Sequence, residues 1–277
     1  MTVPYFYKNS NSRFLSIEGE DSTEFLQNLI TNDINKCSKK NPIYSCLLTP
    51  QGKFICDFFI FKKDEKYLIE THSFFYDKLL KKLNLYKLRS KVHINEIINL
   101  YSYSVFGDLQ KDKDIIIYKN DPRNKNIGNK LIHQRKKPEI LNSFDEIDEK
   151  IYHEILIQNL VPLSHYDLEE NKSLLLENNF ENLNSISWDK GCYVGQEITA
   201  RMKYRSLLKK RIYCLKAKEG SASVGEYIKD DESDYGKIIS VVNNSILAML
   251  KIELAERKIN AQKKIKTNEG LVLEFIL

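Results

Sequence analysis

The last third of the chain, residues 206–277, has the pattern that most restricts the fold. It contains only short runs of strand-forming residues, and turn-forming residues separate them. Strands this short can bury an apolar face only by pairing with one another around a small common core. We therefore expect a small all-β barrel there, with strands at 206–216, 225–228, 236–242, 246–252 and 271–276.

The first 205 residues mix helical and strand patterns instead. Runs 44–48 and 53–61 flank Thr49-Pro50-Gln51-Gly52, in which the positions of proline and glycine indicate a hairpin turn. Residues 74–88 carry apolar side chains at helical spacing. Further strands are expected at 13–18, 66–70, 92–94, 101–106 and 115–118. The predicted class is α+β, with a region 1–205 of two interleaved modules followed by a barrel domain at 206–277.

Two helix starts can be predicted from capping residues. Asp21 with Glu24 forms a capping-box pattern before an apolar stripe. A later helix is expected to begin at a cap on Ser143 or Asp145 and to end before Pro162, because proline cannot continue a helix.

Composition excludes several classes of protein. The net charge is +5, from 43 Lys and Arg against 38 Asp and Glu, and the lysine pairs are scattered, so direct nucleic-acid binding is not expected. An anionic small-molecule partner stays open. No apolar run of about 18 residues and no signal-peptide pattern occurs, so no membrane span is expected. Five cysteines and dispersed histidines show no metal-ligand spacing, so we expect free thiols in a reducing compartment and no metal site.

The segment 188–201 is the densest in candidate functional residues. Cys192 lies between two glycines, shortly before a helix expected to begin at Gln196. Free N–H groups at a helix start and a nearby cation favour a thiolate, and Lys190 or Arg201 could supply that cation. Cys192 and Lys190 are therefore candidate catalytic residues. On composition alone, however, a lone cysteine is more often a packing residue.

Several motifs in this chain resemble those of the YgfZ family of folate-binding proteins, which are relatives of the glycine-cleavage T-protein. The most specific is Lys-Gly-Cys-Tyr-Val-Gly-Gln-Glu at 190–197. Others occur in the family's order along nearly the whole chain, at 15–19, 25–33, 48–53, 88–92, 121–128 and 236–240. Two positions depart from the family pattern: Leu160 replaces a usual glycine, and Leu156 lies where a basic residue is common. Both changes are expected at the cavity wall.

The resemblance implies a fold, a ligand and a site. The fold would be a T-protein-like ring of two α+β modules around a central folate-binding cavity, plus a C-terminal β-barrel. The ligand would be tetrahydrofolate or a one-carbon derivative of it. Cys192 is the position on which the family's function depends. The candidate folate-binding residues are Asp167, Glu177, Trp188, Tyr193, Gln196, Glu197 and Arg201.

The resemblance also implies a role in making or repairing iron–sulfur enzymes, including those that modify tRNA. Client enzymes or assembly proteins would be the partners, in bacterial cytoplasm or a compartment like the mitochondrial matrix. Whether the chain is itself an enzyme stays open; folate-dependent one-carbon transfer is the reaction the resemblance suggests. The alternatives are an aminomethyltransferase of the glycine-cleavage type and a non-catalytic scaffold.

Overall fold

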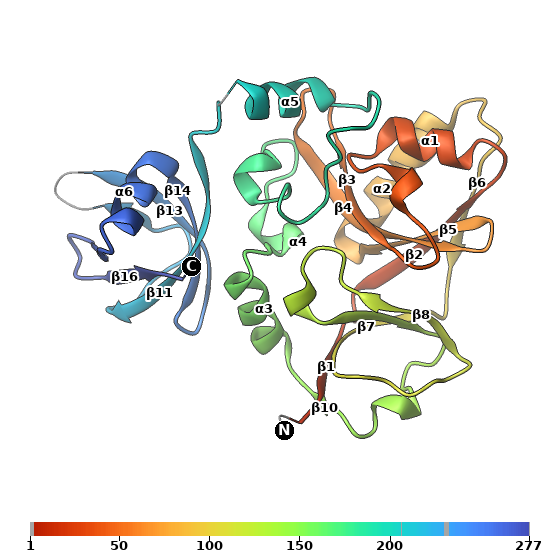
Figure 1. Cartoon of the computed structure of the whole chain (residues 1–277), viewed down its shortest axis with the longest axis horizontal. Coiled ribbons are helices and arrows are strands. Elements are labelled where there is room, and N and C mark those ends of the chain that lie inside the picture. The colour runs from red at the N-terminus through yellow and green to blue at the C-terminus, as the bar shows by residue number, and fades with distance from the viewer. Residues whose placement is uncertain (1–2, 206, 230–232, 277) are drawn as a thin grey trace.

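The computed structural model describes residues 3–205, 207–229 and 233–276, and its strands form three sheets (Figure 1). The first sheet has five strands in the order β3-β4-β5-β2-β6. Their bounds are β3 (Ile43–Leu48), β4 (Phe54–Lys63), β5 (Lys66–His72), β2 (Ser12–Glu18) and β6 (His93–Ile97). Helices α1 (Ser22–Leu29) and α2 (Ser73–Lys87) pack on it through their buried apolar residues. The predicted hairpin is the β3–β4 pair.

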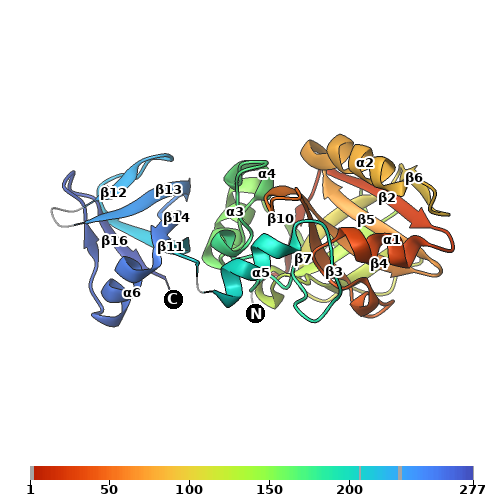
Figure 2. The ribbon, with the colours of Figure 1, turned by 90° about the horizontal axis from the view of Figure 1, so that it is seen from above.

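The second sheet also has five strands, in the order β10-β1-β7-β9-β8. The bounds are β10 (Asp145–Glu146), β1 (Tyr5–Lys8), β7 (Tyr101–Phe106), β9 (Asn129–His133) and β8 (Ile115–Asn120). The chain begins in this sheet, passes through the first and then returns, so the two sheets are interleaved in sequence. Helices α3 (Glu149–Gln158), α4 (Ser164–Asp167) and α5 (Gln196–Tyr204) lie between these sheets and the C-terminal strands (Figure 2).

The third sheet is a nearly closed six-stranded barrel in the order β12-β13-β14-β11-β16-β15. Its elements are β11 (Lys210–Glu219), β12 (Tyr227–Lys229), β13 (Asp234–Val242), β14 (Ser245–Lys251), α6 (Ile252–Asn260), β15 (Ile265–Lys266) and β16 (Val272–Phe275). The α+β class with a C-terminal barrel is thus confirmed. Helix α6 was not predicted, and the expected strand start at Ser206 lies outside the described residues.

Asp21 is the N-cap residue of α1, as predicted, but its side chain does not cap the helix, and the predicted cap of α3 at Ser143 or Asp145 is wrong. The Asp21 carboxylate accepts a hydrogen bond from the Lys91 backbone N–H (2.6 Å) and makes none to its own helix. Helix α3 is capped by Asp148, which accepts from the Ile151 N–H (2.8 Å), whereas Asp145 belongs to strand β10. In each case the residue that the local pattern predicts as a cap makes a different contact, a tertiary hydrogen bond for Asp21 and strand pairing for Asp145.

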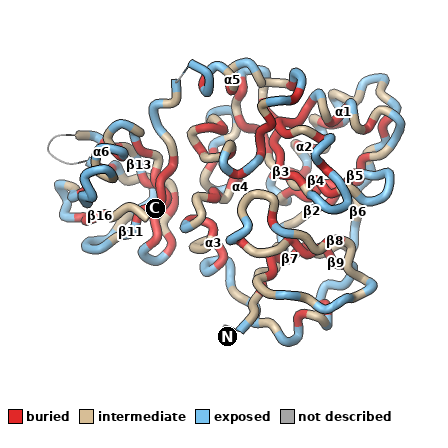
Figure 3. Tube along the Cα trace, viewed as in Figure 1, coloured by how far each residue is buried: buried red, intermediate tan, exposed pale blue. Residues whose placement is uncertain are grey.

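The barrel packs against α3 and α4. Ile157 of α3 and the nearby Leu160 join Ile212, Cys214 and Leu247 of the barrel in one apolar cluster. Figure 3 shows buried segments on the side of the barrel that faces α3.

A buried carboxylate joins α4 to the barrel. Asp167 accepts hydrogen bonds from the Leu163 N–H (2.6 Å) and from the hydroxyl of Ser240, which is fully buried. Burial raises the pKa of Asp167 to about 6. The two hydrogen bonds stabilise the charged carboxylate and lower the pKa, but their effect is smaller.

We predict that Asp167 makes stability fall as pH rises from about 4 to about 6. The folded state holds its proton more tightly than the unfolded chain, so its full stabilising contribution is present only below the unfolded pKa of about 4. In Asp167→Asn the side chain stays neutral. As pH rises across this range, the free energy of unfolding of the variant should therefore increase relative to that of the wild type by about 2–3 kcal/mol. Urea unfolding at a series of pH values measures the difference; a constant difference would contradict it.

Candidate functional site

The loop before α5 is fixed to the first sheet's helix by Lys190. Its ammonium donates to the backbone carbonyls of Gln27 (2.6 Å), Ile30 (2.7 Å) and Asn32 (2.9 Å), at and just beyond the end of α1. Carbonyls at a helix C-terminus lack helical partners and favour a cation. Burial lowers the pKa of Lys190 to about 8, partly offset by the charge of Asp33. All three N–H donors of the ammonium are engaged, which favours an anchoring role for Lys190.

The other end of the loop rests on the β3–β4 turn through two glycines. Gly195 has φ +83°, and a Cβ atom on it would lie 2.4 Å from the Thr49 carbonyl oxygen. Gly52 in the turn has φ +70°, and its Cβ would lie 3.1 Å from the Gly195 oxygen. Side chains at either position would force the two backbones apart. The hairpin motif and the cysteine motif are therefore parts of one structure.

Between these two anchors, Cys192 is exposed, whereas Cys37, Cys46, Cys56 and Cys214 are buried. The Cys192 residue lines an open groove that is predominantly apolar. The groove's other lining residues include Pro50, Tyr86, Ala200, Arg201, Tyr204 and Arg205. The thiol thus lies on an accessible surface that a macromolecule could cover.

The residues that follow Cys192 serve mainly to shape this groove. Tyr193 is buried in the main core, and burial raises its pKa well above the usual range. Gln196 accepts a hydrogen bond from the Tyr193 N–H (3.2 Å). Glu197 and Arg201 form an exposed ion pair on one face of α5 (2.6 Å).

The remaining predicted site residues lie elsewhere. Trp188 donates to Glu181 (3.0 Å) and lines a separate groove beside Tyr44. Asp167 accepts a hydrogen bond from Ser240 of the barrel, and Glu177 Oε2 lies 3.7 Å from Nζ of Lys210 in the barrel. Of the nine predicted site residues, all of which the structure describes, none lines the central cavity. Their role in folate binding stays a prediction.

The central cavity lies where the two five-stranded sheets meet α3 and α4. It measures about 110 Å³ and is lined from β1, β4, β5, β9, α3 and α4. Leu156 forms part of its wall, as expected for a departure that alters the cavity, whereas Leu160 faces the barrel cluster instead. This cavity is the structure's counterpart of the hollow that the resemblance implies.

One wall of the cavity holds a buried ion pair with a spare acceptor. Lys130 donates to Glu70 Oε1 (2.8 Å) and to Ser102 (3.2 Å), and both charged side chains are 3% exposed. Ser12 donates to the same Oε1 (2.7 Å). The other carboxylate oxygen, Glu70 Oε2, is buried without a hydrogen-bond partner among the described residues. Because an unsatisfied buried acceptor is costly, this atom indicates a ligand that donates.

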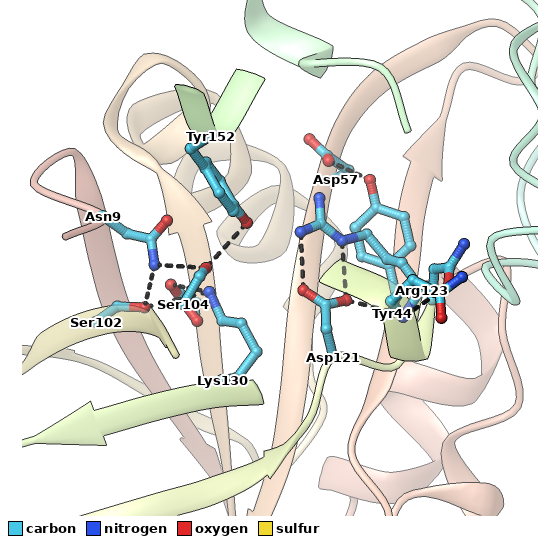
Figure 4. A network of polar contacts seen from close by, with 12 residues as sticks. Asn9, Tyr44, Asp57, Ser102, Ser104, Asp121, Arg123, Lys130 and Tyr152 are labelled. Carbon is cyan, nitrogen blue, oxygen red and sulfur yellow. Dashed lines mark hydrogen bonds and ion pairs between the residues drawn. The ribbon is translucent and has the colours of Figure 1, made fainter. Parts of the chain in front are cut away.

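The opposite wall holds Asp57 and Arg123, and Asp121 pairs with Arg123 behind that wall (Figure 4). Arg123 donates to both oxygens of Asp121 (3.0 and 2.8 Å), and its guanidinium lies over the ring of Phe59. Asp57 accepts from the Tyr44 hydroxyl and from Ser164 (2.8 Å). Sequence reasoning missed Asp57, Glu70 and Lys130 as site residues. The available signal was an acid at position 57 inside an otherwise apolar strand.

Comparison with known proteins identifies the class. The model of the GCVT N-terminal domain matches residues 8–106. The crystal structure of glycine cleavage system aminomethyltransferase T from Bartonella henselae superposes with a TM-score of 0.75. It covers 98% of this chain and 84% of that one at 10% identity, which shows the shared fold. The fold and its central cavity therefore define a T-protein-like protein.

Two curated relatives narrow the family. The mitochondrial iron-sulfur cluster assembly factor IBA57 homolog of Neurospora crassa is 30% identical over 238 residues, 78% of this chain and 54% of that protein. The Homo sapiens factor IBA57 is 28% identical over 222 residues, 72% of this chain and 62% of that protein. The chain thus spans about half to three fifths of their length. With the motifs at 190–197 and elsewhere, these matches place it in the YgfZ family.

We predict that Gly195→Ala destabilises the protein by about 2 kcal/mol or more. An alanine there combines a positive φ with a contact of 2.4 Å to backbone, and strain of this kind costs of order 1–3 kcal/mol. Gly191→Ala is the matched control, because among the described residues no atom would lie within 4 Å of its Cβ. Urea denaturation of both variants measures the effect. Equal stability of the two would contradict the glycine contact.

Proposed function

We propose that this chain is a folate-binding accessory protein for assembly or repair of iron–sulfur proteins, including enzymes that modify tRNA. The observation that carries the proposal is the exposed thiol of Cys192, held on a loop anchored at both ends. Iron–sulfur clusters are bound by cysteine thiolates. The relatives named above are iron–sulfur cluster assembly factors by name, which supports the same role for this chain.

Cys192 would act together with a partner protein. Among the described residues, no group of three or more His, Cys, Asp or Glu is arranged to hold a metal. One thiolate cannot hold a cluster alone, so the remaining ligands would come from a client or assembly protein docked on the groove. That partner would cover the exposed Tyr204 and the apolar residues that line the groove around it. The cluster is cargo in this scheme.

The central cavity fits the head of a reduced folate. A tetrahydropterin presents several N–H donors, and the cavity offers Glu70 Oε2 and the Asp57 carboxylate as acceptors. Phe59 and Phe75 supply apolar lining against which a bicyclic ring can pack. A bound reduced folate would supply a nitrogen that carries a one-carbon unit. The residues of this chain bind and orient its head and exclude bulk water.

The compartment is part of the proposal. Free thiols at all five cysteines suit a reducing environment, either the bacterial cytoplasm or the mitochondrial matrix. The relatives carry the label mitochondrial. Within the described residues, every helix is too short or too polar to cross a membrane.

We predict that Asp57→Asn weakens tetrahydrofolate binding by about 10–100-fold. A hydrogen bond to a charged group contributes about 1.5–3 kcal/mol, and this substitution removes the charge while keeping the shape. Calorimetric titration measures the affinity, because Trp188 lies in a different groove and its fluorescence would not report directly. Glu177→Gln, outside the cavity, should bind as the wild type does. Weaker binding by Glu177→Gln together with unchanged binding by Asp57→Asn would instead favour the site predicted around Glu177.

We also predict that Cys192→Ser abolishes support of iron–sulfur enzymes but leaves folate affinity and stability unchanged. The thiol is exposed, so its removal alters no core contact. The activity of iron–sulfur enzymes in a bacterial strain lacking its own YgfZ-family protein measures the function. Cys37→Ser is the control, because Cys37 is buried and donates to the Ile60 carbonyl, as serine also can. Full function of Cys192→Ser would favour a scaffold role.

A further inference from the structure

We propose that a groove beside Trp188 binds a nucleotide unit, with the base stacked on the indole ring and the phosphates held by lysines. The chemistry of the ligand is an aromatic base joined to phosphate, either as a free nucleotide or as part of single-stranded RNA. Trp188 lines neither the central cavity nor the groove at Cys192, so the proposal goes beyond the function proposed above.

The groove consists of two adjoining hollows, of about 580 and about 440 Å³. Asn41, Pro42 and Pro122 line both of them, so the hollows are continuous. The first lies between the segment that leads into β3 and the loop 181–188, and the second extends along the end of β8. Sites for small molecules typically measure about 300–1,000 Å³, so each hollow has the size of a ligand site.

Hydrogen bonds across the first hollow fix its walls in place. The Asn32 amide donates to the carbonyls of Tyr44 (2.9 Å) and Asn184 (2.7 Å), which joins the first sheet to the loop that precedes Cys192. The Asn184 amide in turn donates to the Pro122 carbonyl (3.1 Å), which joins that loop to the chain after β8. The groove is therefore formed before a ligand binds, so little ordering of the chain opposes binding.

Trp188 provides the stacking surface of the first hollow. Its ring is half-buried and is held in one orientation, because the indole N–H donates to Glu181 (3.0 Å) and the Lys203 ammonium lies 4.2 Å from the ring centroid. Glu181 and Lys203 also form an ion pair with each other. Ile43 and Ile186, both buried, add apolar surface to the same hollow. A fixed indole beside apolar side chains suits the flat face of a nucleobase, since every base can stack on an aromatic ring.

Lysines from two segments that are far apart in the sequence meet at this groove. Lys36 lines the first hollow, and Lys40 and Lys119 line the second. The Lys36 ammonium donates to the Ser187 hydroxyl (2.9 Å), and neither Lys40 nor Lys119 forms an ion pair within the described part of the chain. Ammonium groups bind phosphate as point charges, so these lysines suit a series of phosphates. The sequence did not indicate nucleic-acid binding, because only folding brings these lysines together.

The other polar side chains of the groove offer both donors and acceptors. The side-chain amides of Asn41 and Asn120 make no hydrogen bond to any other described residue, and a carboxamide can pair with the edge of a base. Of the two carboxylates among the described lining residues, Glu181 is already paired. Asp108 is the other, and its oxygens can accept from ribose hydroxyls. An acidic peptide would use the lysines but not the indole, so the lining favours a nucleotide unit.

Titration of the whole chain with an adenylate RNA hexamer, with ATP and with hexaglutamate tests the proposal. Trp188 is the single tryptophan of the chain, so a stacked base should quench its fluorescence. The logarithm of the association constant for the RNA should fall with the logarithm of salt concentration at a slope of about −2, as expected for three phosphate contacts to a single strand. Tighter binding of the RNA than of ATP identifies a strand as the ligand, and the opposite order identifies a free nucleotide; either result supports the site.

Two substitutions separate the lysines from the indole. Lys40→Gln should weaken binding of the RNA and reduce the size of its salt slope by about 0.7, because one phosphate contact is lost. Lys39→Gln is the matched control: Lys39 is an exposed neighbour that pairs with Asp64 (3.1 Å) and does not line the groove, so its loss should change neither quantity. Trp188→Leu should weaken binding of both nucleotide ligands about tenfold by calorimetry, and that of hexaglutamate not at all.

Three results would overturn the proposal. Hexaglutamate could bind as tightly as the better nucleotide ligand, which would show that the lysines alone account for binding. Lys40→Gln could behave as Lys39→Gln does, a result that does not depend on whether the Trp188 variant folds. Finally, none of the three ligands could bind. All three results would leave the proposals for folate and for Cys192 standing, because these substitutions lie outside both of those sites.

Discussion

The binding of the Lys190 ammonium to three backbone carbonyls is the contact on which the arrangement of this molecule depends. It joins a loop near position 190 to the end of a helix near position 30. Burying an ammonium costs free energy unless each of its N–H donors has an acceptor. The three carbonyls therefore fix the loop in the one position that supplies all three acceptors. Gly195 against the β3–β4 turn fixes the other end. Cys192, between the two, is presented at the surface by contacts that are themselves buried.

The thiol and the cavity are separate sites with different electrostatic character. The cavity is partly enclosed, has a mixed polar and apolar lining, and contains buried charges such as the ion pair of Lys130 with Glu70. The groove at Cys192 is open and mostly apolar, with Arg201 and Arg205 on its lining. A small donor-rich molecule suits the first, and a protein surface suits the second. The proposed function accordingly assigns a small molecule to the cavity and a partner to the groove, with Tyr193 and the first sheet's core lying between.

Local pattern predicted most of the fold because most strands and helices here obey it. The β3–β4 hairpin, α2 and five barrel strands follow from turn residues and apolar spacing. Helix α6 was missed because a short amphipathic helix after a strand resembles a polar loop. The charged residues that line the cavity were missed for a different reason. Its acids and bases, Asp57, Glu70 and Lys130, are scattered in sequence and meet only through sheet pairing, which no spacing rule records.

The two departures from the family pattern have different physical consequences. Leu160 keeps a positive φ of 53°, a conformation that costs a non-glycine residue about 1–2 kcal/mol. Its side chain packs into the cluster that joins α3 to the barrel, and burying part of a leucine returns an amount of similar size. The strain is therefore offset within the barrel contact and does not reach the cavity. Leu156, one turn earlier, does line the cavity, and it makes that wall apolar where a charge would otherwise draw an anionic group inward.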